Sequence, residues 1–156
     1  MGVTRIGIAK DKAELVRSLT EIEGKTGPFQ TYADVIAFAA LLGRRRKKRI
    51  PVDAVSKRDP GPISMEVFIS RGYDTIIKLV AIAETQNPKL LSPFELEAEE
   101  QRALIFEEYA NGGLEVLREE CRGTVDYSDR LLLILMAERD RPNQVEGEFD
   151  LTRFLG

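Results

Sequence analysis

The chain has 156 residues, of which 43% are hydrophobic, and its 23 Lys and Arg against 26 Asp and Glu give a formal net charge of −3. This length and composition predict one domain, residues 1–156, with a hydrophobic core of its own. The acidic balance excludes a protein that coats nucleic acid with its whole surface, so any contact with phosphates must be local.

The residue types that are missing exclude several kinds of site. The absence of histidine excludes Ser-His-Asp triads, Cys/His zinc sites and Glu-x-x-His di-iron sites. Neither a Gly-rich phosphate loop nor a metal-ligand cluster is recognisable, so we expect no catalytic residue, no metal and no cofactor. The single cysteine, Cys121, allows no internal disulfide, and no apolar run reaches the roughly 18 residues that span a bilayer. We expect a cytoplasmic protein without a membrane segment.

The N-terminal quarter predicts a strand and two helices. TRIGIAK, residues 4–10, has an extended pattern, and the next twelve residues place Leu15, Leu19 and Ile22 on one face of an amphipathic helix. Thr31 is a suitable N-cap for the following apolar helix. Gly43 is expected to end that helix in the left-handed conformation.

The order strand, helix, helix is also the order of the ribbon-helix-helix fold, in which two chains pair their strands into a ribbon that reads the major groove. If Ile6 and Ile8 face the core, Arg5 alone remains as a base-reading side chain on this strand. Two alternatives stay open. The strand lies at the edge of a helical domain, or a homodimer shares it as a ribbon.

A polar segment, residues 44–62, is predicted to be the longest loop, because Pro51, Pro60 and Pro62 interrupt it. It begins with the basic run, which consists of Arg44, Arg45, Arg46, Lys47, Lys48 and Arg49. The run contains no aromatic residue that could stack on bases, so it is expected to follow a DNA backbone without reading sequence. Two other interpretations remain, namely a solvated loop and a docking patch for an acidic partner.

The second half of the chain is predicted to be helical. Helices are expected over residues 64–70, 73–85, 93–110, 114–121 and 126–139. Ser92 and Glu95 form a potential capping box for the third of these, and Asn111, Gly112 and Gly113 are expected to stop or kink it. A polar tail follows at 140–148, and the apolar residues after it are expected to dock as a final turn: Phe149, Leu151, Phe154 and Leu155. The fold class is therefore mainly α, a single helical domain of about five to seven helices with a short N-terminal strand.

Two segments carry a family resemblance. GPFQTYADVIAFAALLG at 27–43 and RALIFEEYANGGLEVL at 102–117 resemble the Dnd system-associated protein 4 family, also called DNA phosphorothioation-associated protein 4. The resemblance implies a bacterial setting in which sulfur replaces a non-bridging phosphate oxygen of DNA, or in which unmarked DNA is restricted. It assigns no catalytic role to any residue of this chain.

Three residues of the second half invite a chemical role, and each has a simpler interpretation. Glu107 and Glu108 fall away from the apolar helix face, so they are expected to solvate the helix instead of acting as an acid and base pair. A sulfur-transfer setting suggests Cys121 as a persulfide carrier. Glu119 and Glu120 precede it near a helix C-terminus, where a thiolate is disfavoured, so a structural cysteine is expected.

Two classes of function remain open. The first is a non-enzymatic accessory protein of a phosphorothioation modification or restriction system that contacts the DNA backbone through residues 44–49. The second is a protein-interaction or regulatory subunit that binds another protein of the system and not DNA. A salt-dependent affinity for duplex DNA separates the two classes, because backbone contacts weaken steeply with salt.

Overall fold

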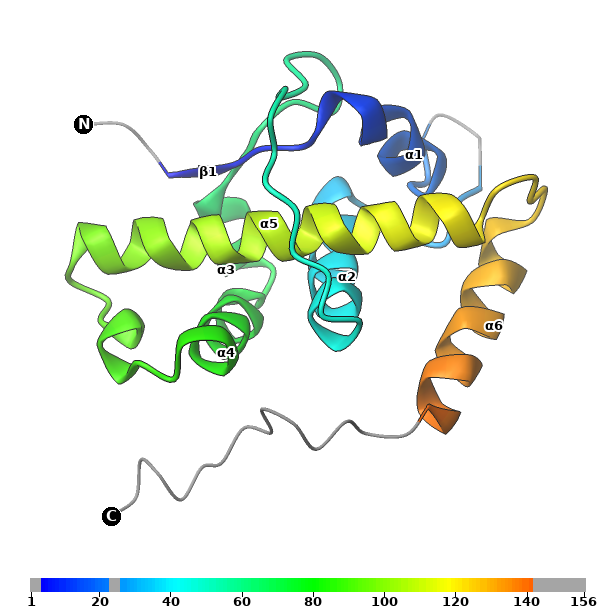
Figure 1. Cartoon of the computed structure of the whole chain (residues 1–156). Helices are drawn as coiled ribbons and strands as arrows, with labels where there is room; N and C mark the ends of the chain where they lie inside the picture. Colours follow the sequence, from blue (N-terminus) through cyan, green and yellow to red (C-terminus); the bar gives the residue numbers. More distant parts are fainter. Residues whose placement is uncertain (1–3, 23–25, 142–156) are drawn as a thin grey trace.

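A long helix, α5 (Leu96–Glu120), forms the axis of the protein, and the other elements gather around it (Figure 1). The computed structural model describes residues 4–22 and 26–141. Its fold is mainly helical, with six α-helices in this described part and a two-stranded antiparallel sheet near the N-terminus. The predicted fold class is therefore confirmed. In the described residues, no helix is both long enough and apolar enough to cross a membrane.

The N-terminal strand pairs within its own chain. β1 (Arg5–Ile6) lies antiparallel to β2 (Ile63–Ser64), with Ile6 opposite Ile63. Beyond β1 the pairing continues, because the Ser56 amide donates to the Ile8 carbonyl oxygen at 2.8 Å. Ile6 and Ile8 are both buried, so the condition under which Arg5 alone remains to read bases is met. In the structure, the strand therefore lies at the edge of a helical domain and pairs within its own chain, which is the first of the two alternatives given for it.

The first predicted helix is shorter than expected. A 3₁₀ turn (Lys10–Lys12) leads into α1 (Ala13–Ser18), which ends four residues before Ile22. Beyond Ser18 the backbone bonds to a distant segment, since the Glu21 amide donates to the Phe29 carbonyl oxygen at 2.7 Å. This pairing competes with further helical hydrogen bonds and ends the helix.

α2 (Tyr32–Arg45) begins as predicted and ends later than predicted. Thr31 and Asp34 form a reciprocal capping box at its start. Gly43 does not stop the helix but faces α5, where an added Cβ would lie 2.0 Å from the Tyr109 carbonyl oxygen. Glycine is required here because the backbones of α2 and α5 touch.

The same crossing explains why α5 is not interrupted. A Cβ at Gly113 would lie 1.7 Å from the Ala39 carbonyl oxygen of α2, and a Cβ at Gly112 would lie 1.8 Å from the Lys48 carbonyl oxygen. The prediction that Asn111, Gly112 and Gly113 stop or kink the helix is therefore wrong. These glycines bring two other segments into contact with a continuous helix.

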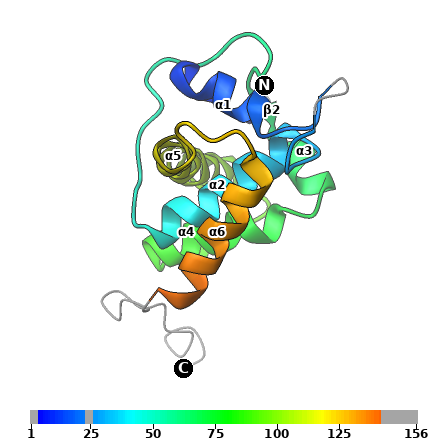
Figure 2. The ribbon, with the colours of Figure 1, turned by 90° about the vertical axis from the view of Figure 1, so that its right-hand side faces the viewer.

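The segment after α2, residues 46–60, crosses α5 on the side away from α2, and we call it the strap (Figures 1 and 2). The Ile50 amide donates to the Glu108 carbonyl oxygen of α5 at 3.0 Å. The predicted loop at 44–62 is thus corrected at its start, because Arg44 and Arg45 belong to α2. α5 lies between α2 and the strap.

The remaining helices complete the core. α3 (Met65–Ser70) is capped by Ser64, and α4 (Asp74–Thr85) ends at Gln86 in the left-handed conformation. A 3₁₀ turn (Pro88–Leu91) precedes α5, whose start has no side-chain cap, so the capping box predicted at Ser92 is wrong. The Ser92 carbonyl oxygen instead accepts a hydrogen bond from Arg102 at 2.9 Å.

α6 (Tyr127–Asp140) follows its N-cap Asp126, within one residue of the predicted start, and turns away from the end of α5 (Figure 1). Leu131 and Ile134 attach it to the main hydrophobic core, which includes an edge-to-face contact between Phe68 and Phe106. The docking expected for Phe149, Leu151, Phe154 and Leu155 concerns residues that lie outside the described part, as does most of the polar tail at 140–148.

Candidate nucleic-acid interface

The basic run covers the last turn of α2 and the start of the strap, and its first side chain turns inward. The Arg44 guanidinium lies over the Tyr109 ring, 5.7 Å from the ring centroid, and donates to the Ala83 carbonyl oxygen of α4 at 3.4 Å. Its Nε is buried and has no hydrogen-bond partner among the described residues. Arg44 therefore joins α2 to α4 and α5 and does not face a ligand.

The next two arginines bind one carboxylate of α6. Arg45 Nε donates to Glu138 Oε2 at 2.9 Å, and Arg46 Nε donates to the other oxygen of Glu138. Arg46 also reaches Glu120 at the end of α5, with 3.0 Å between Nη2 and Oε1. Burial raises the pKa of Glu138, but the hydrogen bonds from both arginines outweigh it, so the pKa lies below its ordinary value. This cluster fastens α6 to α2 and α5.

The last residue of the run, Arg49, binds the outer side of α5. Its Nη2 lies 2.7 Å from Glu108 Oε1, and its Nη1 lies 3.8 Å from Glu84 Oε2. The guanidinium is also 5.9 Å from the centroid of the Tyr109 ring, whose hydroxyl donates to Glu84. Arg44 and Arg49 thus share one aromatic ring, and the strap is fixed to α5 and α4.

Lys47 and Lys48 lie at the turn between these arginines. Lys47 is exposed and has the left-handed φ of 54°, while Lys48 is half-buried with its carbonyl oxygen against Gly112. The turn therefore places the two lysines between two sets of ion pairs. A phosphate that approaches the run has to compete with carboxylates of the same chain for its guanidiniums. The assignment of residues 44–49 to DNA binding stays a prediction.

The paired carboxylates of α5 have specific partners. Glu107 is half-buried and accepts a hydrogen bond from the Gly7 amide at 2.7 Å, and burial raises its pKa. Glu108 binds Arg49, as described above. The expectation that these glutamates only solvate the helix is corrected, because one holds the N-terminal arm and the other holds the strap. Neither contact is visible in the helical pattern alone.

Asn111 makes a second link that sequence reasoning missed. Its Oδ1 accepts from the buried Lys12 Nζ at 2.7 Å, and its Nδ2 donates to the carbonyl oxygens of Ile50 and Pro51 at 3.1 and 3.2 Å. Glu115 Oε2 lies 3.2 Å from the same ammonium group. No local pattern distinguishes a buried lysine whose partners are about 100 residues away. The cavity of about 550 Å³ beside these residues is thus lined by groups that already neutralise one another.

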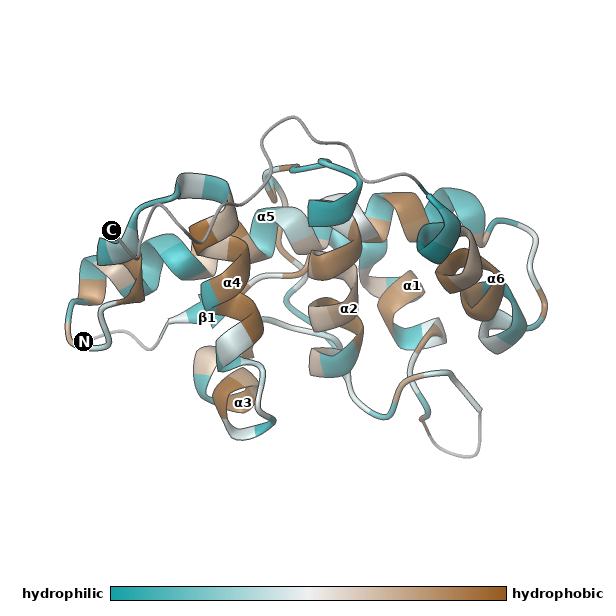
Figure 3. Ribbon diagram, turned by 90° about the horizontal axis from the view of Figure 1, so that it is seen from below, coloured by the Kyte–Doolittle hydropathy of each residue, from teal (hydrophilic) through white to brown (hydrophobic). Residues whose placement is uncertain are grey.

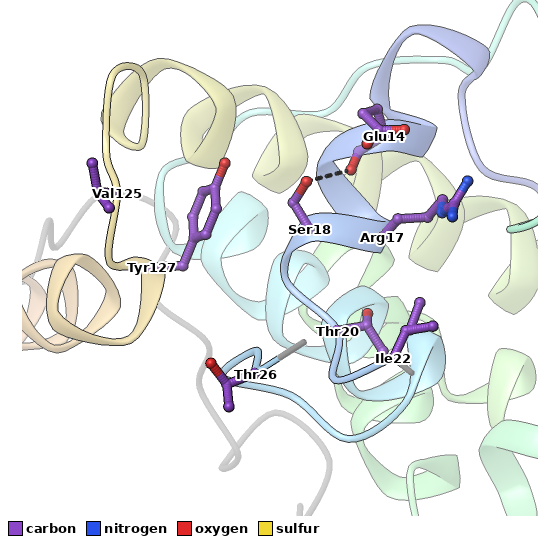
Figure 4. Close-up of a pocket in the computed structure, with 8 residues that line it drawn as sticks. All are labelled: Glu14, Arg17, Ser18, Thr20, Ile22, Thr26, Val125 and Tyr127. Atoms are coloured by element: carbon purple, nitrogen blue, oxygen red, sulfur yellow. Dashed lines mark hydrogen bonds between the residues drawn. The ribbon is translucent and has the colours of Figure 1, made fainter. Parts of the chain in front are cut away.

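A second cavity, of about 340 Å³, lies between the end of α1 and the start of α6 (Figure 4). Hydroxyl groups line it, but Ser18 Oγ donates to the Glu14 carbonyl oxygen at 2.9 Å and Thr20 Oγ1 donates to the Val16 carbonyl oxygen at 2.7 Å. These bonds use the hydroxyl protons within the helix. The described residues also contain no group of three or more acidic or cysteine side chains arranged to hold a metal ion.

A shallow groove of about 560 Å³ lies between α2 and α4, and we call it the α2/α4 groove. Apolar side chains form most of its lining: Pro28, Phe29, Ala37, Phe38, Leu41 and Ile76. At its rim Asp34 binds Arg71 Nη2 at 2.9 Å and accepts a hydrogen bond from the Tyr73 hydroxyl. Figure 3 shows apolar residues along the sides of α2 and α4 that face the viewer.

Cys121 lies at the end of α5 in the main core and is 4% exposed. Burial raises the pKa of its thiol, the nearby Arg130 lowers it, and Glu120 raises it, so the net direction is upward. A thiol that stays protonated and excluded from solvent is a poor nucleophile. This environment fits a structural cysteine.

The comparisons with known proteins place this geometry in a family. The model of the family described as DNA sulphur modification system-associated protein 4 matches residues 5–154, which is nearly the whole chain. The comparisons with curated proteins and with solved structures gave no match. The matched region includes both segments on which the resemblance was based, 27–43 and 102–117, and these contain the capping box of α2 and the glycines of the α2–α5 crossing. The chain belongs to the DNA sulphur modification system-associated protein 4 family.

Proposed function

We propose that this chain is a non-enzymatic protein-interaction subunit of a DNA sulphur modification system. It works in the cytoplasm and binds another protein of that system through the α2/α4 groove. One observation carries the proposal. The arginines of the basic run bind groups of their own chain, whereas mostly partly buried apolar side chains line a shallow groove.

The charge balance around the basic run supports this choice over a DNA handle. Three of its arginines have carboxylate partners among Glu84, Glu108, Glu120 and Glu138, and these four negative charges offset most of the six positive ones. Affinity for a DNA backbone comes mainly from cations that replace condensed counterions. Cations that already pair with carboxylates gain little from that exchange, because the phosphate must displace the existing partner.

The apolar side chains at the groove favour an amphipathic helix of the partner protein as the segment that binds there. Leu41 on α2 and Leu79 on α4 are about half exposed, and Leu79 lies one turn after the groove residue Ile76. An amphipathic helix with apolar residues at i, i+3 and i+4 fits such a groove. At the rim, the partly exposed guanidinium of Arg71 can donate to a polar residue at one end of that helix.

Pairwise co-expression tests the proposal. The chain is co-expressed with each of the other proteins of the system, one at a time, and complexes are detected by affinity purification and size-exclusion chromatography. The variant Leu41→Glu/Leu79→Glu is expected to lose the complex, because it places two charges on the apolar contact. Leu104→Glu is the matched control, since Leu104 is about as exposed and lies on α5, not on either of the two helices that border the groove. A complex that survives the double variant, or the absence of any binary complex, contradicts the proposal.

Contact with a DNA backbone is the second candidate function. The exposure of Lys47 at the turn after α2 favours it, because this side chain can approach a phosphate without unfolding the strap. The test is a salt series with duplex DNA. Steeply salt-dependent binding that needs Lys47 and Lys48 would support this second function.

A further inference from the structure

The middle of α6 is apolar on every side, although α6 lies at the edge of the protein (Figures 2 and 3). Leu131 and Ile134 are buried against the core. On the outer side, Leu132, Leu133, Leu135 and Met136 are 56%, 55%, 49% and 44% exposed, and we call these four residues the α6 outer face. A helix that is apolar all round is usually covered on all sides. The α6 outer face therefore requires a covering segment.

The chain itself continues from the end of this helix. Residues 142–156 follow, with a polar stretch at 142–148 and then Phe149, Leu151, Phe154 and Leu155. The end of α6, from which these residues continue, is fixed in place, because Arg45 Nη2 donates to the carbonyl oxygens of Glu138 at 2.8 Å and Arg141 at 3.2 Å. The sequence thus places four apolar residues within 14 residues of Arg141, the C-cap of α6.

We propose that residues 149–155 bind the α6 outer face of the same chain. The polar stretch of seven residues spans up to about 24 Å when extended, which is enough to reverse direction at the end of α6. Leu132 and Met136 are about 6 Å apart along the helix axis, at 1.5 Å per residue. A segment that runs back along α6 therefore reaches the whole face with residues to spare.

A segment of the same chain fits this face better than a second copy of the protein does. Four half-exposed side chains form a patch on the order of a few hundred Å². Stable association of two subunits usually buries roughly 800 Å² on each partner. A tethered segment needs less contact area, because its effective concentration near the face is on the order of millimolar. The contact does not depend on which partner occupies the α2/α4 groove.

Disulfide trapping tests the contact, since the native Cys121 is buried and slow to react. We pair Leu151→Cys with Leu132→Cys in one full-length variant and with Met136→Cys in another. Both α6 positions are exposed, so neither change disturbs the core. Leu151→Cys with Leu104→Cys is the control, because Leu104 is exposed on the half of α5 far from α6 (Figure 1). Leu151→Cys with Leu41→Cys reports occupation of the α2/α4 groove.

Mild oxidation is followed by non-reducing electrophoresis and peptide mass spectrometry at several protein concentrations. We expect both α6 pairs to form intrachain disulfides at least tenfold faster than the Leu104 pair, at a rate independent of concentration. Equal rates for all pairs would overturn the proposal. Crosslinked dimers that increase with concentration would assign the face to a second copy, and preferential trapping at Leu41→Cys would assign residues 149–155 to the groove; either result also overturns it.

Discussion

Replacement of Gly113 by alanine is expected to destabilise the protein strongly, although alanine is the better helix former. The substitution adds a Cβ that would lie 1.7 Å from the Ala39 carbonyl oxygen, whereas an ordinary contact begins at 3.4 Å. The backbones of α2 and α5 must therefore separate by up to about 1.7 Å, or one helix must bend. Neither adjustment is local, because the obstructing atom belongs to the backbone of a buried helix.

The magnitude follows from two opposing effects. Alanine in place of glycine stabilises an exposed helix position by about 1 kcal/mol. Overpacking of a core usually costs about 1–3 kcal/mol and more when backbones must move. Separation of α2 from α5 also opens the small-residue contact that includes Ala39 and Ala110, both of which are buried. We expect the free energy of unfolding of Gly113→Ala to fall by about 3 kcal/mol or more.

Urea denaturation followed by circular dichroism measures this change. Gly61→Ala is the control, because a Cβ there would lie 3.6 Å from its nearest neighbour, the Lys57 carbonyl oxygen. The control is expected to change stability by less than about 1 kcal/mol. If Gly113→Ala were as stable as the wild type or more stable, the close crossing of α2 and α5 would be wrong.

Three further predictions concern single side chains. Glu138→Gln is expected to lower the free energy of unfolding by about 1–3 kcal/mol at pH 7, because Arg45 and Arg46 lose a charged acceptor. The folded pKa of Glu138 lies below its ordinary 4.5, so its contribution to the free energy of unfolding is present above about pH 4.5 and is lost as pH falls through the folded pKa. Denaturation at several pH values should therefore show that the variant loses less stability in acid than the wild type does. Equal losses of stability in acid would contradict the ion pair. Cys121 should react with a thiol reagent at least tenfold more slowly in the folded protein than in urea, and equal rates would refute its burial. Thr31→Ala should lower the melting temperature by several degrees through loss of the α2 N-cap, a cost of about 0.5–2 kcal/mol, and an unchanged melting temperature would count against the cap.

Sequence analysis found those elements whose position depends on residues close to one another in the sequence. The predicted cap Thr31 begins α2 and acts within three residues of sequence, as Ser64 and Asp126 do at α3 and α6. The alternation that buried Ile6 and Ile8 is equally local. Sequence reasoning therefore found most helices and the strand, and with them the fold class.

Contacts between distant segments limited the prediction of helix ends and of the candidate site. Glycine permits a turn as well as a close approach of two backbones, and only the position of α2 shows that Gly113 serves the second purpose. The basic run has the same ambiguity. Six adjacent cations predict a phosphate contact or a solvated loop equally well, until the fold brings Glu138, 92 residues from Arg46, against the run.

The proposal that the basic run fastens helices and does not bind DNA is tested most directly by fluorescence anisotropy with a labelled duplex from about 50 to 200 mM salt. The wild type is compared with Lys47→Gln/Lys48→Gln, which removes two cations of the run and keeps the arginine ion pairs that hold the fold. We predict weak binding near physiological salt and the same salt slope for both proteins. Tight wild-type binding, with a slope that falls by about 2 in the double variant, would contradict the proposal and make the run a DNA-backbone contact.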